Sequence, residues 1–380
     1  MRCLYCNREK EDITGEHVIP RGIGGNIKPT NPFKLREVCS GCNHSCGRYI
    51  DGPFIRSWFT QQGRATSAVH VFKPGATESL PLNYMGLLTD VSFGSRICES
   101  WLGPTGDRIF HFHEPYPLEP DSPFVVGLPP HLPEDEVDPG FVFLFVRSNN
   151  PVWWPVIVSS VIEQFTGAQY FLGNGPMPRG GAFGAIPSEL IDLHQMLMTL
   201  GAQHHTQGRI SVDYGSRFLG KLALGIGGLF LDSSFRSSSS ADVLRDFLWT
   251  KRLEERQRIP VRGRNFLAGE DRNFRNLAAF LRWRGGHLLL MLPKAGYLVL
   301  YAAFFEGQAA TIAVSNEPQH WQSMDKNDGV TYVISPGLHK CVGPVRLTAF
   351  IAHRMGLLVN ASLKELEDEE QESPLPPFDV

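Results

Sequence analysis

Two pairs of cysteines constrain the first fifty residues of this chain more than any other feature. Cys3 and Cys6 form one CxxC pair, and Cys39 and Cys42 form the other. Each CxxC turn places two thiolates on one side of a tight bend, and two such turns complete a tetrahedral site for Zn²⁺. Since so short a segment buries little apolar surface, we expect structural zinc to supply folding free energy of order ~10 kcal/mol.

The three other cysteines, Cys46, Cys98 and Cys341, have no matching spacing. Cys46 is an alternative fourth ligand, but the symmetric pairing favours Cys42. Paired metal thiolates are typical of a reducing compartment, whereas a disulfide scaffold is typical of secreted proteins. The N-terminus is polar and lacks the apolar core of a secretory signal, so we expect a cytoplasmic protein.

Length and charge limit the classes of function. A chain of 380 residues fits two or three domains. Its net charge of −3 argues against a protein that binds polyanions over its whole surface, so any nucleic-acid surface must be local. The chain contains no apolar run of 18 residues, and we expect no membrane segment and no membrane partner.

The segment between the cysteine pairs carries residues suited to phosphodiester hydrolysis. Glu16 and His17 precede a Val-Ile-Pro step and a glycine turn, and Asn43 directly follows Cys42. An imidazole titrates near neutrality and can act as a general base, while a carboxylate is a hard oxygen ligand for Mg²⁺ or Mn²⁺. Adjacent strand residues point to opposite sides, so Glu16 and His17 can serve one site only if the strand ends there.

This order of motifs, over residues 3 to about 51, resembles the HNH endonuclease family, whose fold is the ββα-metal motif. The resemblance implies that His17 is the general base and that Glu16 and Asn43 hold a catalytic Mg²⁺ or Mn²⁺ ion. It also implies that Asn31 braces the loop carrying the base, and that the tetrathiolate zinc is structural.

Two alternatives remain open within that resemblance. Asn26 also follows the glycine turn and competes with Asn31, and His44 is the alternative ligand if Asn43 faces away. Position 43 is Asn where many family members have His, and position 16 is Glu. Both are oxygen ligands that favour ions like Mg²⁺.

Basic residues are only mildly concentrated in the chain. Residues 1–64 contain ten Lys or Arg and six acids, and residues 251–284 contain ten and four. Three aromatic residues lie among the basic residues of the second segment: Phe266, Phe274 and Trp283. This pattern allows a nucleic-acid groove in which aromatic side chains stack on bases. We favour an amphipathic helix whose aromatic side chains are buried, and we expect the tryptophans of residues 152–155 in the core.

The rest of the chain reads as alternating strands and helices. Residues 285–315 predict a three-stranded antiparallel meander, residues 97–113 predict two strands around a turn, and residues 140–148 predict a buried strand. Residues 155–165 fit either a helix or a strand. We predict helices at residues 188–200, 216–231, 240–256 and 345–358, although the glycines at 225, 227 and 228 weaken the second.

Histidines outside the first segment lack carboxylate or cysteine neighbours at metal-ligand spacing along the sequence. His111 and His113 are predicted to share one face of a strand, which permits metal binding. We expect this pair to be incidental.

Together these patterns predict an α+β protein with three parts. A small zinc-stapled ββα-metal (HNH) domain occupies residues 1–58, and a larger mixed α+β body, with room for two subdomains, occupies residues 65–360. Residues 361–380 are acidic and proline-rich and are predicted to be a solvated tail.

The function predicted from the sequence is a metal-dependent endonuclease that hydrolyses DNA, with RNA as the open alternative target. The body would recognise DNA, an activating ligand or a protein partner, and a role in bacterial defence against foreign DNA fits by analogy. The competing hypothesis is a non-catalytic zinc knuckle that binds nucleic acid or protein, in which Glu16 and His17 have no catalytic role.

Overall fold

The computed structural model describes residues 1–73, 75, 79–115, 139–174, 187–200, 205–207, 215–266, 280–305, 308–325 and 327–371. Phe274, part of the basic segment discussed above, and the chain end at 372–380 lie outside the described residues. None of the helices in the described ranges combines the length and apolarity needed to cross a bilayer.

The chain forms two compact units. One combines Met1–Ile55 with Ser211–Glu372, and the other comprises Arg56–Ile210 with Ser373–Val380. This division differs from the expected one, because the zinc-bracketed segment groups with the C-terminal half of the chain.

In the first unit, the N-terminal segment has the predicted ββα order. Strand β1 (Ile13–His17) pairs antiparallel with β2 (Lys34–Cys39), and helix α1 (Ser40–Cys46) follows at once. A 3₁₀ turn, Arg21–Ile23, lies between the strands. The helical path continues through a π-helical turn, Gly47–Asp51, into α2 (Gly52–Ile55).

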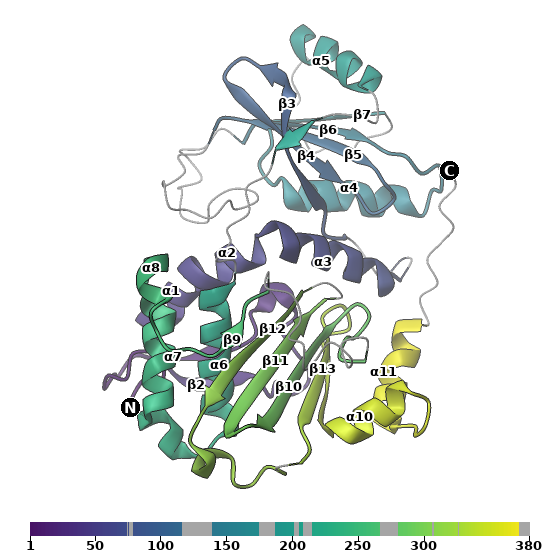
Figure 1. Ribbon diagram of the computed structural model, residues 1–380. Coiled ribbons are helices and arrows are strands. Elements are labelled where there is room, and N and C mark those ends of the chain that lie inside the picture. Colours follow the sequence, from purple (N-terminus) through teal and green to yellow (C-terminus); the bar gives the residue numbers. More distant parts are fainter. Residues whose placement is uncertain are drawn as a thin grey trace. The chain divides into compact units, whose positions relative to one another are not determined.

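A six-stranded antiparallel sheet forms the centre of the same unit, in the order β14-β13-β10-β11-β12-β9 (Figure 1). The predicted meander is confirmed as β10 (His287–Lys294), β11 (Tyr297–Phe304) and β12 (Gln308–Ser315). The remaining strands are β9 (Gly263–Arg264), β13 (Val330–Ser335) and β14 (Lys340–Arg346).

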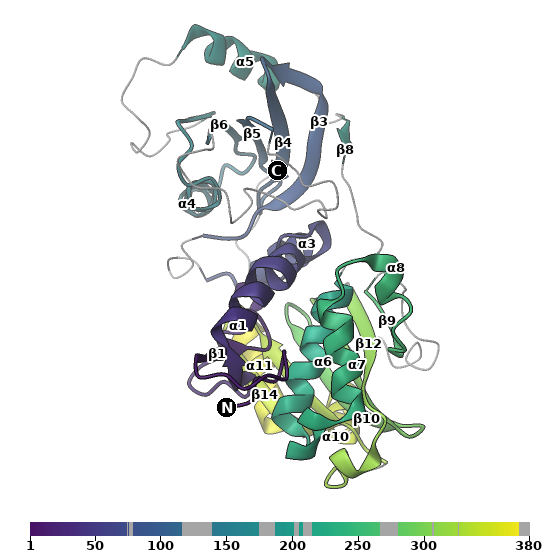
Figure 2. The same ribbon diagram turned by 90° about the vertical axis from the view of Figure 1, so that its left-hand side faces the viewer.

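Helices cover both faces of this sheet. Helix α6 (Ser216–Phe230) packs beside α7 (Ser239–Trp249) and next to β12 (Figures 1 and 2), and its Phe218 ring lies 5.6 Å from Phe304. On the opposite face, α10 (Leu347–Arg354) and α11 (Ala361–Gln371) complete a core cluster with side chains of β10, β11 and β13.

Two sequence-based expectations for this unit need correction. The helix expected at 240–256 is divided at Thr250 into α7 and the short α8 (Leu253–Arg256). The tail expected from residue 361 is a helix as far as Gln371, because Leu363 and Leu366 recur at helical spacing and are buried in the core.

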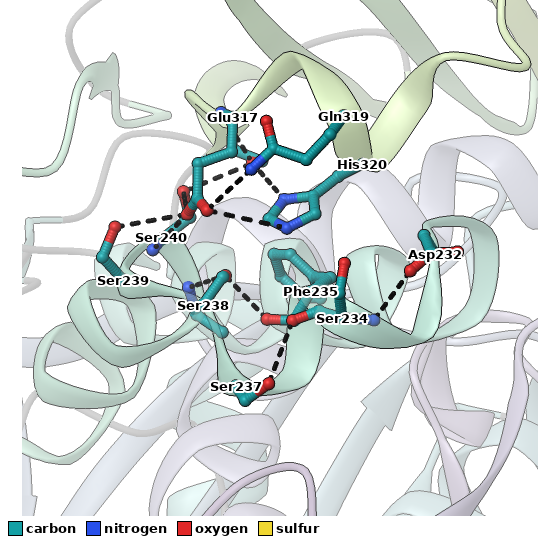
Figure 3. Close-up of polar contacts among 12 residues, drawn as sticks. Asp232, Ser234, Phe235, Ser237, Ser238, Ser239, Ser240, Glu317, Gln319 and His320 are labelled. Atoms are coloured by element: carbon teal, nitrogen blue, oxygen red, sulfur yellow. Dashed lines mark hydrogen bonds and ion pairs between the residues drawn. The ribbon is translucent and has the colours of Figure 1, made fainter.

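A polar network fixes the start of α7. Ser238 caps the helix by accepting a hydrogen bond from the Ala241 N–H at 3.2 Å. The Glu317 carboxylate accepts hydrogen bonds from Ser239 and Ser240, and the His320 ring lies 3.7 Å from it (Figure 3). A 3₁₀ turn, Ser233–Ser237, precedes the cap, and Pro318–Trp321 carries His320. The serine-rich segment therefore caps α7 and joins it to the loop after β12.

The glycines of α6 let the N-terminal segment approach this helix closely. A Cβ on Gly225 would lie 2.7 Å from the Val18 methyl groups, and one on Gly228 would lie 2.4 Å from Leu4. Leu4 and Val18 are fully buried. The glycines that lower helix propensity are therefore needed for packing, and the zinc-bracketed segment shares its core with α6.

The second unit is built on a mixed six-stranded sheet in the order β7-β6-β5-β4-β3-β8, in which only the β6–β7 pairing is parallel among the described strands. The strands are β3 (Asn83–Phe93), β4 (Arg96–Leu102), β5 (Arg108–His113), β6 (Phe141–Phe145), β7 (Tyr170–Gly173) and β8 (Thr206–Gln207). The strands expected at 97–113 and 140–148 are thus confirmed.

Helices also cover both faces of this second sheet. Helices α3 (Trp58–His70) and α4 (Trp153–Gln164) pack on one face, and α5 (Ser188–Thr199) packs on the other. The ambiguous segment 155–165 is therefore mostly helix. Trp153 is fully buried and stacks on Phe72 at 4.4 Å, as expected of a core residue.

We predict that Gly225→Ala lowers the stability of the first unit by about 1–3 kcal/mol, because the added methyl group overpacks against Val18. Gly47→Ala is the matched control, since a Cβ there meets nothing within 4 Å and its backbone is right-handed helical. Denaturant unfolding of the full-length protein measures the stability of both variants. Equal midpoints for the two variants would contradict the close approach, and adding Val18→Ala to Gly225→Ala should cost less than the two changes summed.

Candidate functional site

The four cysteines of the two CxxC pairs converge. One sulfur atom from each of Cys3, Cys6, Cys39 and Cys42 lies within 4.8 Å of the others. The Cys39 N–H points at the Cys3 sulfur, 3.3 Å away. The contact between Cys3 and Cys42 lowers the pKa of Cys3 and raises the pKa of Cys42, so the two thiols share a proton when no metal is bound. This donor set fits a structural Zn²⁺ ion.

Cys46 lies outside this cluster, although it is fully buried at the end of α1. Burial raises its pKa well above the usual range. The choice of Cys42 over Cys46 as the fourth ligand therefore agrees with the geometry.

His17 ends β1 with its ring fixed by the glycine turn. Its Nδ1 lies 2.7 Å from the Gly25 carbonyl oxygen, which can only accept a hydrogen bond. Nδ1 therefore carries the proton in the neutral ring, and Nε2 has the lone pair. The Arg21 Nε–H donates to that Nε2 at 3.2 Å.

Asn31 lies beside His17, whereas Asn26 does not. The Asn31 side-chain amide donates to the same Gly25 oxygen at 2.7 Å, and its own oxygen accepts the Phe33 N–H at 2.9 Å. Asn26 instead bonds to His339 at 2.9 Å. The geometry thus favours Asn31 over Asn26 as the residue that holds the turn beneath the His17 ring.

Only glycine fits at position 25. A Cβ there would lie 1.7 Å from the Ile19 carbonyl oxygen. This close approach brings the Gly25 carbonyl under His17, so the glycine turn positions the imidazole.

Glu16 points away from this turn and into the protein. Its side chain is buried, and one carboxylate oxygen lies 2.5 Å from the ammonium nitrogen of Lys221 on α6. The same nitrogen lies 2.7 Å from Asp51 and 3.3 Å from the His17 carbonyl oxygen. Glu16 and His17 therefore face opposite sides of β1, as alternation along a strand requires.

Lys221, Glu16 and Asp51 form a buried ionic cluster with one positive and two potentially negative groups. Burial raises the pKa of Asp51 to about 6, with Lys221 lowering it and Glu16 raising it further. Burial opposes the charge on Lys221, but Asp51 and Glu16 outweigh it and raise the lysine's pKa above its usual value. The lysine is thus held as an ammonium ion.

The expected pair of cation ligands is only partly supported. The Asn43 amide nitrogen donates to the Thr14 hydroxyl at 2.9 Å and to the Gly15 carbonyl at 3.2 Å, so its oxygen is the atom left to bind a cation. Glu16 is already engaged by Lys221. The four cysteines fit a structural zinc ion. Glu16 and Asn43 do not form the predicted site for a second cation, because the Glu16 carboxylate contacts Lys221 instead.

The surroundings of His17 are cationic. Arg21 and Lys34 are both exposed, and Lys34 pairs with His17 across the strands. Partial burial lowers the pKa of His17, the Gly25 carbonyl raises it, and Arg21 and Lys34 lower it further, so the shift is downward. A neutral imidazole beside two cations is suited to accept a proton next to a bound anion.

Sequence reasoning missed Lys221, Asp51 and Arg21. The signal for Lys221 was present, because it is the only charged residue in the apolar run from Phe218 to Phe230 of α6. A lone buried lysine requires an acidic partner. Nothing in the sequence indicates that the partners are Glu16, some 200 residues earlier, and Asp51.

Comparison with known families identifies the N-terminal segment. Residues 3–59 match the family model described as HNH endonuclease. No curated protein and no solved structure gives a significant match to the chain. Together with the cysteine cluster and the ββα order, the family match makes this segment a zinc-bracketed HNH domain.

We predict that Cys3→Ser removes one zinc equivalent from the protein and destabilises the N-terminal segment, because a bound structural metal contributes folding free energy. Cys46→Ala is the matched control and should keep its zinc. Elemental analysis after gel filtration measures the stoichiometry. Unchanged zinc in Cys3→Ser would contradict the assignment of the cluster.

We predict that Lys221→Met destabilises the first unit by about 3–5 kcal/mol, since it leaves buried carboxylates without their cation. Lys221→Met combined with Asp51→Asn should recover part of that loss. Unfolding midpoints at one fixed pH make the comparison. A single variant as stable as the unaltered protein would contradict the buried ionic cluster.

Proposed function

We propose, from the HNH endonuclease domain at residues 3–59, that this protein is an endonuclease that hydrolyses phosphodiester bonds in DNA. The family match supports nuclease activity in general. The observation that carries the finer proposal is the orientation of His17, whose Nε2 lone pair faces the exposed Arg21 rather than the interior.

His17 is the proposed general base. Its Nδ1–H remains bonded to Gly25, so Nε2 is the nitrogen that takes a proton from water. The resulting hydroxide forms a new P–O bond, the bond from phosphorus to the departing sugar oxygen breaks, and that oxygen takes a proton from solvent. Asn31 supports this step indirectly by holding the Gly25 carbonyl.

Arg21 and Lys34 are proposed to hold the phosphate. In this structure the Arg21 guanidinium donates a hydrogen bond to His17 Nε2. A charged phosphate oxygen is a stronger acceptor for this guanidinium than a neutral imidazole nitrogen. DNA binding would therefore draw Arg21 onto the phosphate and leave Nε2 for the attacking water. Phosphate contacts of this kind dominate affinity for DNA and weaken with salt.

The HNH family implies a divalent cation, Mg²⁺ or Mn²⁺, which would neutralise charge developing on the phosphate. Asn43 remains the proposed ligand, with the exposed His44 as its alternative, whereas the Glu16 carboxylate is engaged by Lys221.

The same engagement of Glu16 favours one competing function, a non-catalytic zinc module that binds nucleic acid or a protein. In either case we propose a cytoplasmic protein whose remaining residues recognise DNA, an activating ligand or a protein partner. Cleavage of foreign DNA in bacterial defence is the biological role that we propose for the catalytic form.

We predict that the full-length protein nicks plasmid DNA with Mg²⁺ or Mn²⁺, and that His17→Ala lowers the rate by about 10²–10⁴-fold through loss of the base. Asn31→Ala should also lower the rate, because it releases the Gly25 carbonyl. Asn26→Ala is the matched control and should retain the rate, since Asn26 bonds to His339 instead.

The same assay distinguishes the two functions. Unchanged zinc content in His17→Ala shows that lost activity does not reflect lost folding. Wild-type protein that binds DNA but never cleaves DNA or RNA, with either cation and with cell extract added, would overturn the endonuclease proposal and support the zinc module.

A further inference from the structure

A second group of metal-ligating side chains lies in the other unit, within its six-stranded sheet. Glu99 on β4 is directly opposite His111 on β5, and His113 follows two residues later on the same face. The carboxylate oxygens of Glu99 lie 3.6 Å from His111 Nδ1 and 3.6 Å from His113 Nε2. All three residues are at most 5% exposed.

The hydrogen bonds around the cluster determine which ring nitrogens carry protons. His111 Nε2 lies 2.9 Å from the Pro139 carbonyl oxygen, and His113 Nδ1 lies 2.8 Å from the Glu114 carbonyl oxygen. Since carbonyl oxygens only accept, those two nitrogens carry the N–H groups. In neutral rings, the nitrogens facing Glu99 therefore present lone pairs.

Two lone pairs directed at a carboxylate are unfavourable unless a positive charge lies between them. One proton shared with Glu99 would satisfy one nitrogen only. If both rings were protonated, two cations stacked with centroids 4.6 Å apart would face one carboxylate. The cluster would then carry a net charge of +1 in the core, and burying a net charge is costly. A divalent cation satisfies both nitrogens and the carboxylate together.

The distances and the outer contacts also fit a metal site. Metal–nitrogen bonds of about 2.0–2.1 Å place tetrahedral ligand atoms about 3.3–3.5 Å apart. This range is close to the 3.6 Å between each ring nitrogen and a Glu99 oxygen, and all three ligand atoms lie within 4.8 Å of one another. Metal-binding histidines usually donate their other N–H to a carbonyl or carboxylate, as both rings do. The Trp101 indole N–H, at 3.1 Å, orients the Glu99 carboxylate.

We propose that Glu99, His111 and His113 bind a divalent transition-metal ion, with Zn²⁺ as the best match, separate from the zinc of the HNH domain. Two imidazoles and one carboxylate suit Zn²⁺ and Fe²⁺ and disfavour Mg²⁺ and Ca²⁺, which take oxygen ligands. The ion would cross-link the neighbouring strands β4 and β5. This proposal replaces the expectation that the two histidines are incidental, because Glu99 lacks metal-ligand spacing along the sequence but lies directly opposite His111 across the β4–β5 pairing.

The test uses the full-length protein reconstituted with Zn²⁺ and passed over a chelating resin. We expect two zinc ions per chain in the unaltered protein, and one in Glu99→Gln and in His111→Gln. His194→Gln is the matched control and should retain two, because His194 on α5 packs against Phe145 on the other face of the sheet.

Cobalt substitution separates this site from the cysteine cluster. The thiolate-to-cobalt charge-transfer band reports the cysteines and should be the same in Glu99→Gln as in the unaltered protein, while the weaker bands of a nitrogen–oxygen site disappear. One metal ion in the unaltered protein, bound with the full thiolate band, would overturn the proposal whether or not the variants fold.

Discussion

A single buried ammonium group joins the two halves of the first unit. Lys221, in the middle of α6, contacts Glu16 from β1, Asp51 from the turn after α1, and the His17 carbonyl. All three side chains are buried, so the cost of removing each charge from water is offset by its oppositely charged partner. The path of the strand that carries His17 is thereby tied to a helix about 200 residues away.

Close packing supports the same connection. The glycines of α6 admit Leu4 and Val18, and the backbone carbonyls of Leu4 and Tyr5 accept hydrogen bonds from Arg245 and Trp249 on α7 at 2.8 Å. The zinc-bracketed segment is therefore not an independent head on a separate body. The cysteine cluster, which fits a structural zinc ion, lies at one end of this segment, while α6 and α7 supply the apolar surface that a segment of some fifty residues cannot bury alone.

Local features of the site could be predicted from the sequence, and long-range ones could not. The cysteine pairs and the order of β1, β2 and α1 depend on spacing within forty residues. The same is true of the contact between His17, Gly25 and Asn31, which one tight turn creates. The Lys221 cluster and the burial of the helix at residues 361–371 depend on elements that meet only in the folded chain. Glu99 and His111 lie opposite each other in the hairpin predicted at residues 97–113, and spacing along the sequence missed the pair because it is formed across two strands.

Glu16 and His17 have different surroundings because their side chains leave β1 on opposite faces. The family pattern places an acid and a base side by side, and it requires both to reach one site. Here β1 remains extended through His17, so the two side chains stay on opposite faces. The glycine turn holds His17, the proposed base, whereas the Glu16 carboxylate is paired with Lys221 on a helix that lies outside the family match. Whatever cation the domain uses must therefore be bound without Glu16, or must compete with an ammonium ion that two carboxylates hold.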